Sequence, residues 1–207
     1  MKRWLGIVAV VLVACTVPDA PDHSGYYQFA DISGDIFSWP GSRLPVRFWA
    51  DPRGNMKDLV QNAINEWQDQ FMYGEFTGVM VSDSGHADVQ FTWSGSVPAT
   101  VAPDPGPPVK ACGGLTQPDS VSGNQVYGAF HSSITILSGP ATPGQVEACV
   151  RRTVIHEMGH TLGILTEAPD STDIMYFTPL VPTPSAADRT TVQVLYHTAP
   201  NLLPPKR

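Results

Sequence analysis

The chain has 207 residues with a formal net charge of −7, and 42% of its residues are hydrophobic. A domain commonly has about 100–200 residues, so this length predicts one domain with short appendages. The hydrophobic fraction suits a buried core and excludes a wholly disordered chain. The acidic charge excludes the basic face that a nucleic-acid-binding protein requires.

The N-terminal residues 1–14 are predicted to be a secretory signal peptide. A basic start, Lys2 and Arg3, precedes an uncharged run from Trp4 to Val13. That run is too short to span a bilayer, which takes about 20 apolar residues, and no later segment is apolar enough to do so. We therefore expect the mature protein to lie outside the cytoplasm.

The signal peptide ends in Leu-Val-Ala followed by Cys15, which resembles the lipobox of bacterial lipoproteins. The resemblance implies a cell-envelope lipoprotein that contacts the membrane only through a lipid on Cys15. The alternative is an ordinary signal peptide cut near Ala14, which makes the protein secreted. Residues 15–40 contain prolines and lack a sustained periodicity. They are interpreted as the lipidated cysteine and a tether, or at most an irregular lead-in to a domain over residues 41–207.

Apolar patterning predicts the elements in the first half of that domain. Residues 44–50 alternate and are rich in β-branched and aromatic side chains, which predicts a strand. Residues 56–71 carry apolar side chains at the i, i+3, i+4 and i+7 spacing of a core-facing helix. Two further strands are predicted over residues 78–81 and 88–93.

The second half begins with a proline-rich segment, residues 96–109. Proline lacks the main-chain donor, so this segment is predicted to be a surface loop. A strand over residues 133–137, a helix with Thr142 as its N-cap and a last helix capped by Ser185 are expected to follow. This order of elements predicts an α+β fold with a mixed sheet.

The second helix contains the sequence His156-Glu157-Met158-Gly159-His160. Side chains four residues apart share one helix face, so His156 and His160 can bind one metal ion, and imidazole is a good Zn²⁺ ligand. Glu157 lies beside them without occupying a ligand position, which suits a general base that takes a proton from water. The alternative is a chance match, with two exposed histidines on a polar helix face.

Two features beyond this motif extend it. Gly163 stands three residues after His160, where the helix can break, and Met175 follows in the stretch Asp-Ile-Met-Tyr. With the histidine motif they resemble the metzincin clan of zinc endopeptidases, most closely its matrixin-type bacterial members. The resemblance is detailed over residues 153–176 and loose elsewhere. It implies a zincin-like domain: a mixed twisted sheet, an N-terminal helix, an active-site helix, and a small C-terminal subdomain with a methionine turn at Met175 and a terminal helix.

The third zinc ligand departs from the family pattern. The family has a histidine or aspartate three residues after the glycine, where this chain has Thr166. A threonine hydroxyl is a poor zinc ligand, whereas the next residue, Glu167, can complete a His₂Glu site with an open position for water. We favour Glu167, with Asp170 and Asp173 as weaker candidates. A site without a third protein ligand is the remaining alternative.

The resemblance also implies that an edge strand above the active-site helix pairs with an extended peptide substrate. The position-matched segment is residues 112–117, which contains glycines and is equally compatible with a loop. The two remaining cysteines are Cys112 and Cys149. In an oxidising compartment a disulfide between them is expected, and two separate buried thiols are the alternative.

Together these features predict a monomeric, lipid-anchored, zinc-dependent endopeptidase that acts on peptides or proteins. Zn²⁺ is expected to bind His156, His160 and Glu167, with Glu157 as the general base for a metal-activated water. The alternative is a catalytically inactive surface lipoprotein that binds metal and uses the groove to bind peptides or proteins. The retained Glu157 favours catalysis, and the missing third histidine favours the alternative.

Overall fold

A computed structural model describes most of the chain after the predicted signal peptide. The described residues are 25–94, 112–136 and 143–206, without the side chains of 143–145. The signal peptide, Cys15, the segment 96–109 and the expected N-cap Thr142 lie outside the described residues. Within the described ranges, no helix is long and apolar enough to cross a membrane.

A five-stranded mixed sheet forms one layer of the molecule, in the order β2-β1-β3-β5-β4. Neighbouring strands from β2 to β5 are parallel, and β4 pairs antiparallel with β5 at the edge of the sheet. The strands are β1 (Val46–Ala50), β2 (Gly78–Met80), β3 (Val89–Ser94), β4 (Cys112–Ser122) and β5 (Gln125–Ile136).

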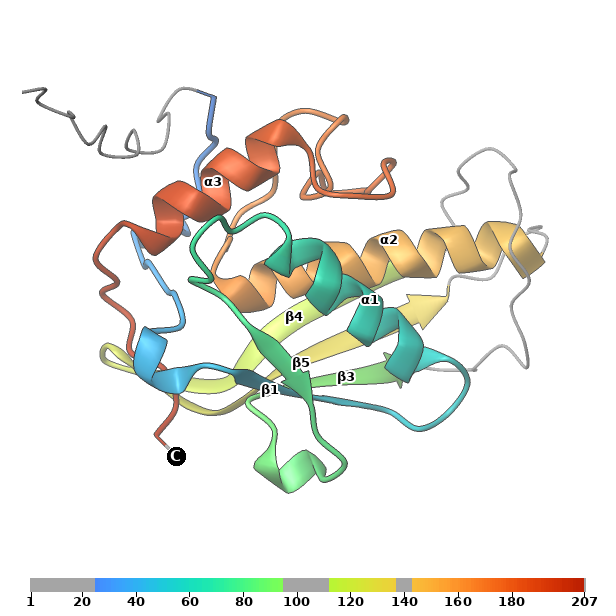
Figure 1. Ribbon diagram of the computed structural model, residues 1–207, viewed down its shortest axis with the longest axis horizontal. Coiled ribbons are helices and arrows are strands. Elements are labelled where there is room, and N and C mark those ends of the chain that lie inside the picture. The colour runs from blue at the N-terminus through green and yellow to red at the C-terminus, as the bar shows by residue number, and fades with distance from the viewer. Residues whose placement is uncertain (1–24, 95–111, 137–142, 207) are drawn as a thin grey trace, which may run out of the picture.

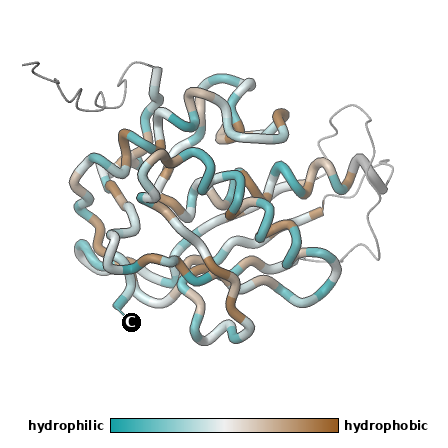
Figure 2. The backbone as a smooth tube through the Cα atoms, viewed as in Figure 1, coloured by the Kyte–Doolittle hydropathy of each residue, from teal (hydrophilic) through white to brown (hydrophobic). Residues whose placement is uncertain are grey.

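Helices α1 (Met56–Gln68) and α2 (Pro143–Leu162) lie side by side over one face of this sheet (Figure 1). Hydrophobic and hydrophilic residues alternate along both helices (Figure 2). The apolar stripe predicted for α1 is buried from Met56 to Trp67, and the indole Nε1 of Trp67 donates a hydrogen bond to the Ile155 carbonyl of α2 at 2.8 Å. The predicted α+β class with a mixed sheet is confirmed.

The last helix is α3 (Ala186–Tyr196), and its expected N-cap, Ser185, is confirmed. The Ser185 hydroxyl accepts from the main-chain N–H of Asp188, and the Asp188 carboxylate accepts from that of Ser185. This reciprocal pair is a capping box, which satisfies main-chain donors that a helix start leaves without partners.

The strand predictions are correct for β1 to β3 but incomplete for β5. Residues 112–117, for which strand and loop were equally compatible, form part of the strand β4. The predicted strand 133–137 covers only the end of β5, which begins at Gln125, and residue 137 lies outside the described residues. Gly123 and Asn124 form a two-residue turn that joins β4 to β5. A Gly-Asn pair between two strands is a hairpin signal, so this turn was available in the sequence.

Of the two interpretations of residues 15–40, the irregular lead-in and not the tether describes the second half, because residues 25–40 pack onto the domain. Phe37 and Trp39 have exposed fractions of 0% and 1%, and their rings pack on each other and on Phe130 of β5. The Trp39 indole also donates to the Thr161 carbonyl of α2 at 2.8 Å. Burying such rings stabilises a fold by a few kcal/mol each, so the folded domain begins before residue 41.

The expected disulfide is confirmed and joins Cys112 of β4 to Cys149 of α2. The two residues are 37 positions apart, and closing a loop of that size contributes about 4 kcal/mol in the chain-entropy model. The bond ties the edge strand to the helix that carries the histidine motif.

Candidate metal centre

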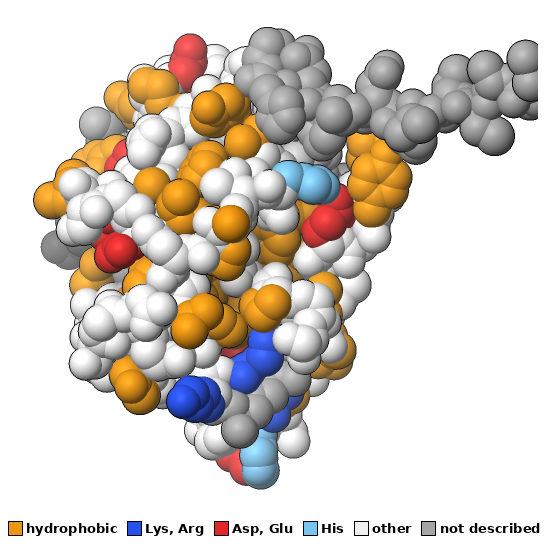
Figure 3. Space-filling view, turned by 90° about the vertical axis from the view of Figure 1, so that its left-hand side faces the viewer, with side chains coloured by type: hydrophobic (Ala, Val, Ile, Leu, Met, Phe, Trp, Pro, Cys, Tyr) orange, Lys and Arg blue, Asp and Glu red, His pale blue; other side chains and the backbone are white. Residues whose placement is uncertain are grey.

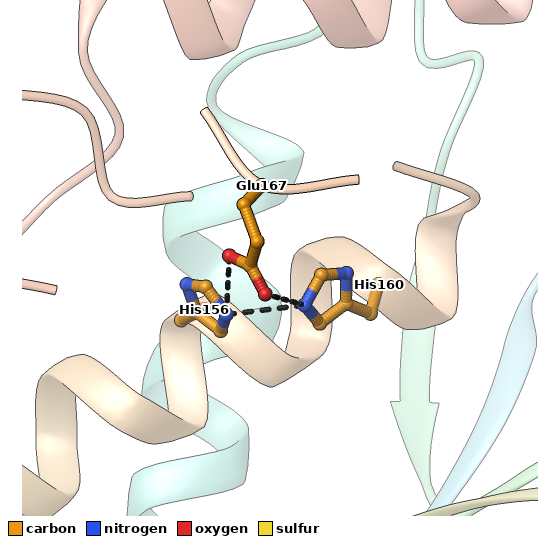
Figure 4. A group of neighbouring side chains, drawn as sticks. All are labelled: His156, His160 and Glu167. Carbon is orange, nitrogen blue, oxygen red and sulfur yellow. Dashed lines mark hydrogen bonds and ion pairs between the residues drawn. The ribbon is translucent and has the colours of Figure 1, made fainter. Parts of the chain in front are cut away.

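Three donor groups converge at the C-terminal half of α2 (Figure 4). His156 and His160 stand one helical turn apart, and their Nε2 atoms are 3.1 Å from each other. The carboxylate of Glu167, from the loop after α2, places Oε2 at 3.4 Å from His156 Nε2 and Oε1 at 3.6 Å from His160 Nε2. These three residues form a group that can hold a metal ion.

The distances are those of groups that can share one ion. Two zinc ligands at about 2.0–2.1 Å from the metal lie about 3.3 Å from each other in a tetrahedron. The two Nε2 atoms are 3.1 Å apart, and they lie 3.4 and 3.6 Å from different oxygens of Glu167. A site with one ligand atom from each residue would leave a fourth tetrahedral position open.

The hydrogen bonds behind the imidazoles orient both rings for metal binding. His156 Nδ1 lies 2.9 Å from the Ile174 carbonyl, and His160 Nδ1 lies 2.6 Å from the Ile164 carbonyl. A carbonyl oxygen can only accept, so each Nδ1 carries its proton and, in a neutral ring, each Nε2 carries a lone pair. The two Nε2 atoms, 3.1 Å apart, can therefore share a proton or bind one metal ion.

The protonation states of the three donors are coupled. Burial, together with the neighbouring His160, lowers the pKa of His156 to about 4, so this imidazole is neutral at neutral pH. Burial acts to lower the pKa of His160, but hydrogen bonding to Glu167 and the charge of Glu157 outweigh it and raise that pKa. Burial acts to raise the pKa of Glu167, but the contact with His160 brings it below its usual value. A metal ion would therefore meet a neutral His156 and an ionised Glu167, and it would displace the proton that the Glu167 contact favours on His160.

The other ligand candidates from the sequence have different partners. Thr166 donates its hydroxyl hydrogen bond to the Gln28 carbonyl. Asp170 accepts from both the main chain and the hydroxyl of Thr172, and Asp173 accepts from the Ser185 hydroxyl at 2.6 Å. The structure therefore brings only Glu167, among the candidates weighed, to the two histidines.

Gly163 ends α2 and turns the chain back toward the histidines. Its φ of +108° is rarely adopted by residues with a side chain, and a Cβ there would lie 1.9 Å from the Phe37 carbonyl oxygen. The N-terminal segment therefore packs directly on the helix end. After this turn, the carbonyl oxygen of Ile164 lies 2.6 Å from His160 Nδ1. Glu167 comes three residues later in the same loop.

Met175 is fully buried and lies against α2 at Gly159. Gly159 leaves room for it, because a Cβ at Gly159 would lie 2.3 Å from the Met175 sulfur. The buried carboxylate of Asp188 accepts from the N–H groups of Ile174 and Met175 at 2.8 and 3.3 Å. Sequence reasoning missed Asp188, although its place three residues after the Ser185 cap is a signal for a capping box.

Glu157 faces β4 instead of joining the donor group. Its carboxylate Oε2 accepts a 2.6 Å hydrogen bond from the Thr116 hydroxyl, which also lies 2.7 Å from the Ser132 hydroxyl. A Cβ at Gly114 would lie 2.2 Å from Glu157 Oε1, so any side chain there would displace this carboxylate. Burial raises the pKa of Glu157. Neither Gly114 nor Thr116 was identified from the sequence, which carries no local signal for a contact with a residue some forty positions away.

A cleft of about 630 Å³ opens onto these side chains and is lined by His156, Glu157, His160 and Glu167. One wall is the edge strand β4, including Leu115, and the other includes residues 177–179. Leu115 and Phe177 have exposed fractions of 60% and 77%. The candidate site is therefore an open groove with apolar walls, and its floor carries the charged groups.

The outer edge of β4, with which no other described strand pairs, offers main-chain hydrogen bonds to this cleft. In β5, the N–H of Phe130 points toward β3 and donates to the Asp88 carbonyl. Peptide groups of successive residues in a strand point to opposite sides, so those of Ser133, three residues later, point toward β4. Ser133 pairs with Leu115. Gly114 and Thr116, on either side of Leu115, therefore direct their N–H and C=O groups away from β5, toward the open edge.

The remaining described histidines belong to other parts of the surface. Each pairs with a carboxylate outside the three-donor group: His86 with Asp83, His131 with Asp119, and His197 with Glu75. His23 lies outside the described residues.

Comparison of the chain with protein-family models and with curated proteins finds no match. The metal centre is therefore inferred from the geometry and chemistry of this chain alone.

Proposed function

We propose that this protein is a zinc-dependent endopeptidase with a zincin-like, metzincin-type domain. Three features that meet in one open cleft carry the proposal: a three-donor metal group, a buried glutamate outside that group, and a strand edge with which no other described strand pairs. A purely structural metal site needs neither the open cleft nor the glutamate.

His156, His160 and Glu167 are the residues that would hold the ion. When bound, Zn²⁺ supplies Lewis acidity, which acidifies water and polarises a carbonyl group. Two imidazoles and one carboxylate are common zinc ligands, whereas an all-oxygen donor set would favour magnesium or calcium. The donor set is therefore the reason for proposing zinc.

Glu157 takes the proton from water and returns it to the leaving amine. Its raised pKa brings the carboxyl group closer to neutral pH, where a group can both accept and release a proton efficiently. Its hydrogen bond from Thr116 occupies Oε2, which leaves Oε1 for the reacting proton. Thr116 thus fixes the direction in which the base points.

The substrate is proposed to be an extended peptide that adds a strand to β4. The outward N–H and C=O groups of Gly114 and Thr116 can pair with peptide groups of any sequence, while Leu115 and Phe177 contact its side chains. The peptide would then run past Glu157 and the metal group. We further propose that the chain acts as a monomer outside the cytoplasm, anchored by a lipid on Cys15.

Metal removal tests the proposal on the purified full chain. We expect one zinc ion per chain and cleavage of an unstructured protein such as casein. Dialysis against a zinc chelator should abolish the cleavage, and added zinc should restore it. Zinc content is measured by elemental analysis and cleavage by gel electrophoresis and mass spectrometry. A zinc-loaded chain that cleaves neither casein nor a peptide library would favour the non-catalytic metal-binding lipoprotein.

Substitution of Gly114 by alanine tests the position of the proposed general base, Glu157. The added methyl group overlaps the end of the Glu157 side chain, which can move, so the fold and the metal group should survive. We expect the cleavage rate to fall roughly 10- to 100-fold, because an error of about 1 Å in a catalytic group costs that much. Gly113→Ala is the matched control, since its Cβ meets no atom within 4 Å. Equal cleavage rates for the two variants would contradict the position assigned to the Glu157 carboxylate.

A further inference from the structure

The loop that carries Glu167 is attached to a segment more than 130 residues earlier in the chain. The N–H of Leu165 donates to the Phe29 carbonyl at 2.8 Å, and the hydroxyl of Thr166 donates to the Gln28 carbonyl. Leu165 and Thr166 are the two residues immediately before Glu167. We call residues 27–29 the strap.

The strap is itself held on α3. Tyr27 donates its hydroxyl to Asp188 at 2.5 Å, and its N–H donates to the Thr191 hydroxyl at 3.1 Å. The side chains of Tyr27 and Phe29 are buried, at 8% and 9% exposure. The strap lies on the side of the molecule shown in Figure 3, where hydrophobic side chains are spread over the surface. A segment fixed in this way can serve as a rigid support.

The loop is fixed on both sides of Glu167, but by different partners. On the far side, the Ala168 N–H donates to the Met175 carbonyl at 2.7 Å. On the near side, the strap supplies the hydrogen bonds to Leu165 and Thr166. The Glu167 side chain is 42% exposed, so packing around it does little to hold it in place. The position of its carboxylate thus depends on these two attachments.

We propose that the strap positions Glu167 for metal binding through the hydroxyl of Thr166. Thr166 is then a positioning residue that contributes to zinc affinity without touching the ion. The strap becomes part of the metal centre, although none of residues 27–29 lines the cleft. This inference rests on the proposed metal site, but not on proteolytic activity.

The test measures zinc affinity of the full chain by competition with a chromophoric zinc chelator. Residues that orient a metal ligand typically change metal affinity 10- to 100-fold when they are removed. We expect Thr166→Val to weaken zinc binding about 10-fold and Thr166→Ser, which keeps the hydroxyl, to restore it to within about 2-fold. Thr172→Val is the matched control, because it removes a threonine hydroxyl bond to Asp170 in the same loop. It should bind zinc as the wild type does.

A double-mutant cycle separates positioning from a general loss of structure. In a Glu167→Ala background the same Thr166→Val change should alter zinc affinity by less than about 2-fold, because the ligand it positions is gone. An equal loss in both backgrounds, or wild-type affinity in Thr166→Val, would overturn the role of the strap while leaving the metal site intact. A wild-type chain that binds no zinc would overturn the metal site itself, and the strap with it.

Discussion

Substitution of Glu157 by glutamine is expected to remove peptide cleavage and leave zinc binding intact. Glutamine has nearly the shape of glutamate and can still accept the hydrogen bond from Thr116, but it cannot take a proton from water. General acid–base catalysis contributes about 10²- to 10⁴-fold to a rate, so a loss in that range is expected. Initial rates on a fluorogenic peptide at saturating zinc measure this loss.

The control for this variant is Glu147→Gln, the same substitution in the same helix. Glu147 forms an ion pair with Arg151 four residues on, which is worth only a few tenths of a kcal/mol on a helix. Its rate should match that of the wild type. If Glu157→Gln kept more than a tenth of the wild-type rate, the role of general base would be wrong.

The same variant makes a prediction about stability in the metal-free protein. Burial raises the pKa of Glu157, so the folded state disfavours its charged form. A carboxyl group with a raised folded-state pKa reduces stability as the pH rises above its unfolded value. Metal-free Glu157→Gln should therefore unfold at the same temperature as the metal-free wild type, or at a higher one, at neutral pH.

Substitution of Glu167 by alanine is expected to remove both zinc and activity. Two imidazoles would remain, without the carboxylate that balances part of the charge of the ion. We expect zinc affinity to fall at least about 100-fold, more than for a residue that acts only through a ligand. Isothermal titration with zinc and the peptide assay measure the two losses.

Asp170→Ala serves as the matched control for this loss. It removes a carboxylate from the same loop, and in the structure that carboxylate binds Thr172. It should retain zinc. Full occupancy and activity in Glu167→Ala would show that Glu167 is not the third ligand.

The part of the site that lies on one helix was predictable from the sequence, because helical spacing alone brings His156 and His160 to one face. Glu167 was predictable only by chemistry, since its loop has no periodicity and the choice over Thr166 rested on ligand preference. The position of the Glu157 carboxylate against β4 was not predictable. Gly114 meets the carboxylate only when the edge strand crosses α2, and that crossing is a property of the tertiary structure.

The fold, like the site, was predictable only where the sequence has a local pattern. Helix α1 and strands β1 to β3 have strong local patterns, and the structure contains them within a few residues of the expected bounds. For the N-terminal segment the sequence left a tether and an irregular lead-in both open, because its aromatic residues have no regular spacing. They fill gaps between distant elements, as Trp39 does between β5 and α2. Such burial depends on the shape of the receiving surface, which local patterns do not encode.

The attachment of Tyr27 to α3 limits the distance between the cleft and the membrane that would hold the proposed lipid anchor. Because the folded domain already includes Tyr27, only residues 16–26 separate it from Cys15. Eleven residues span at most about 40 Å even when fully extended. An anchored molecule would therefore work within roughly one domain diameter of the bilayer. Its substrates would be selected first by their presence at the membrane surface, and only then by their fit to the groove.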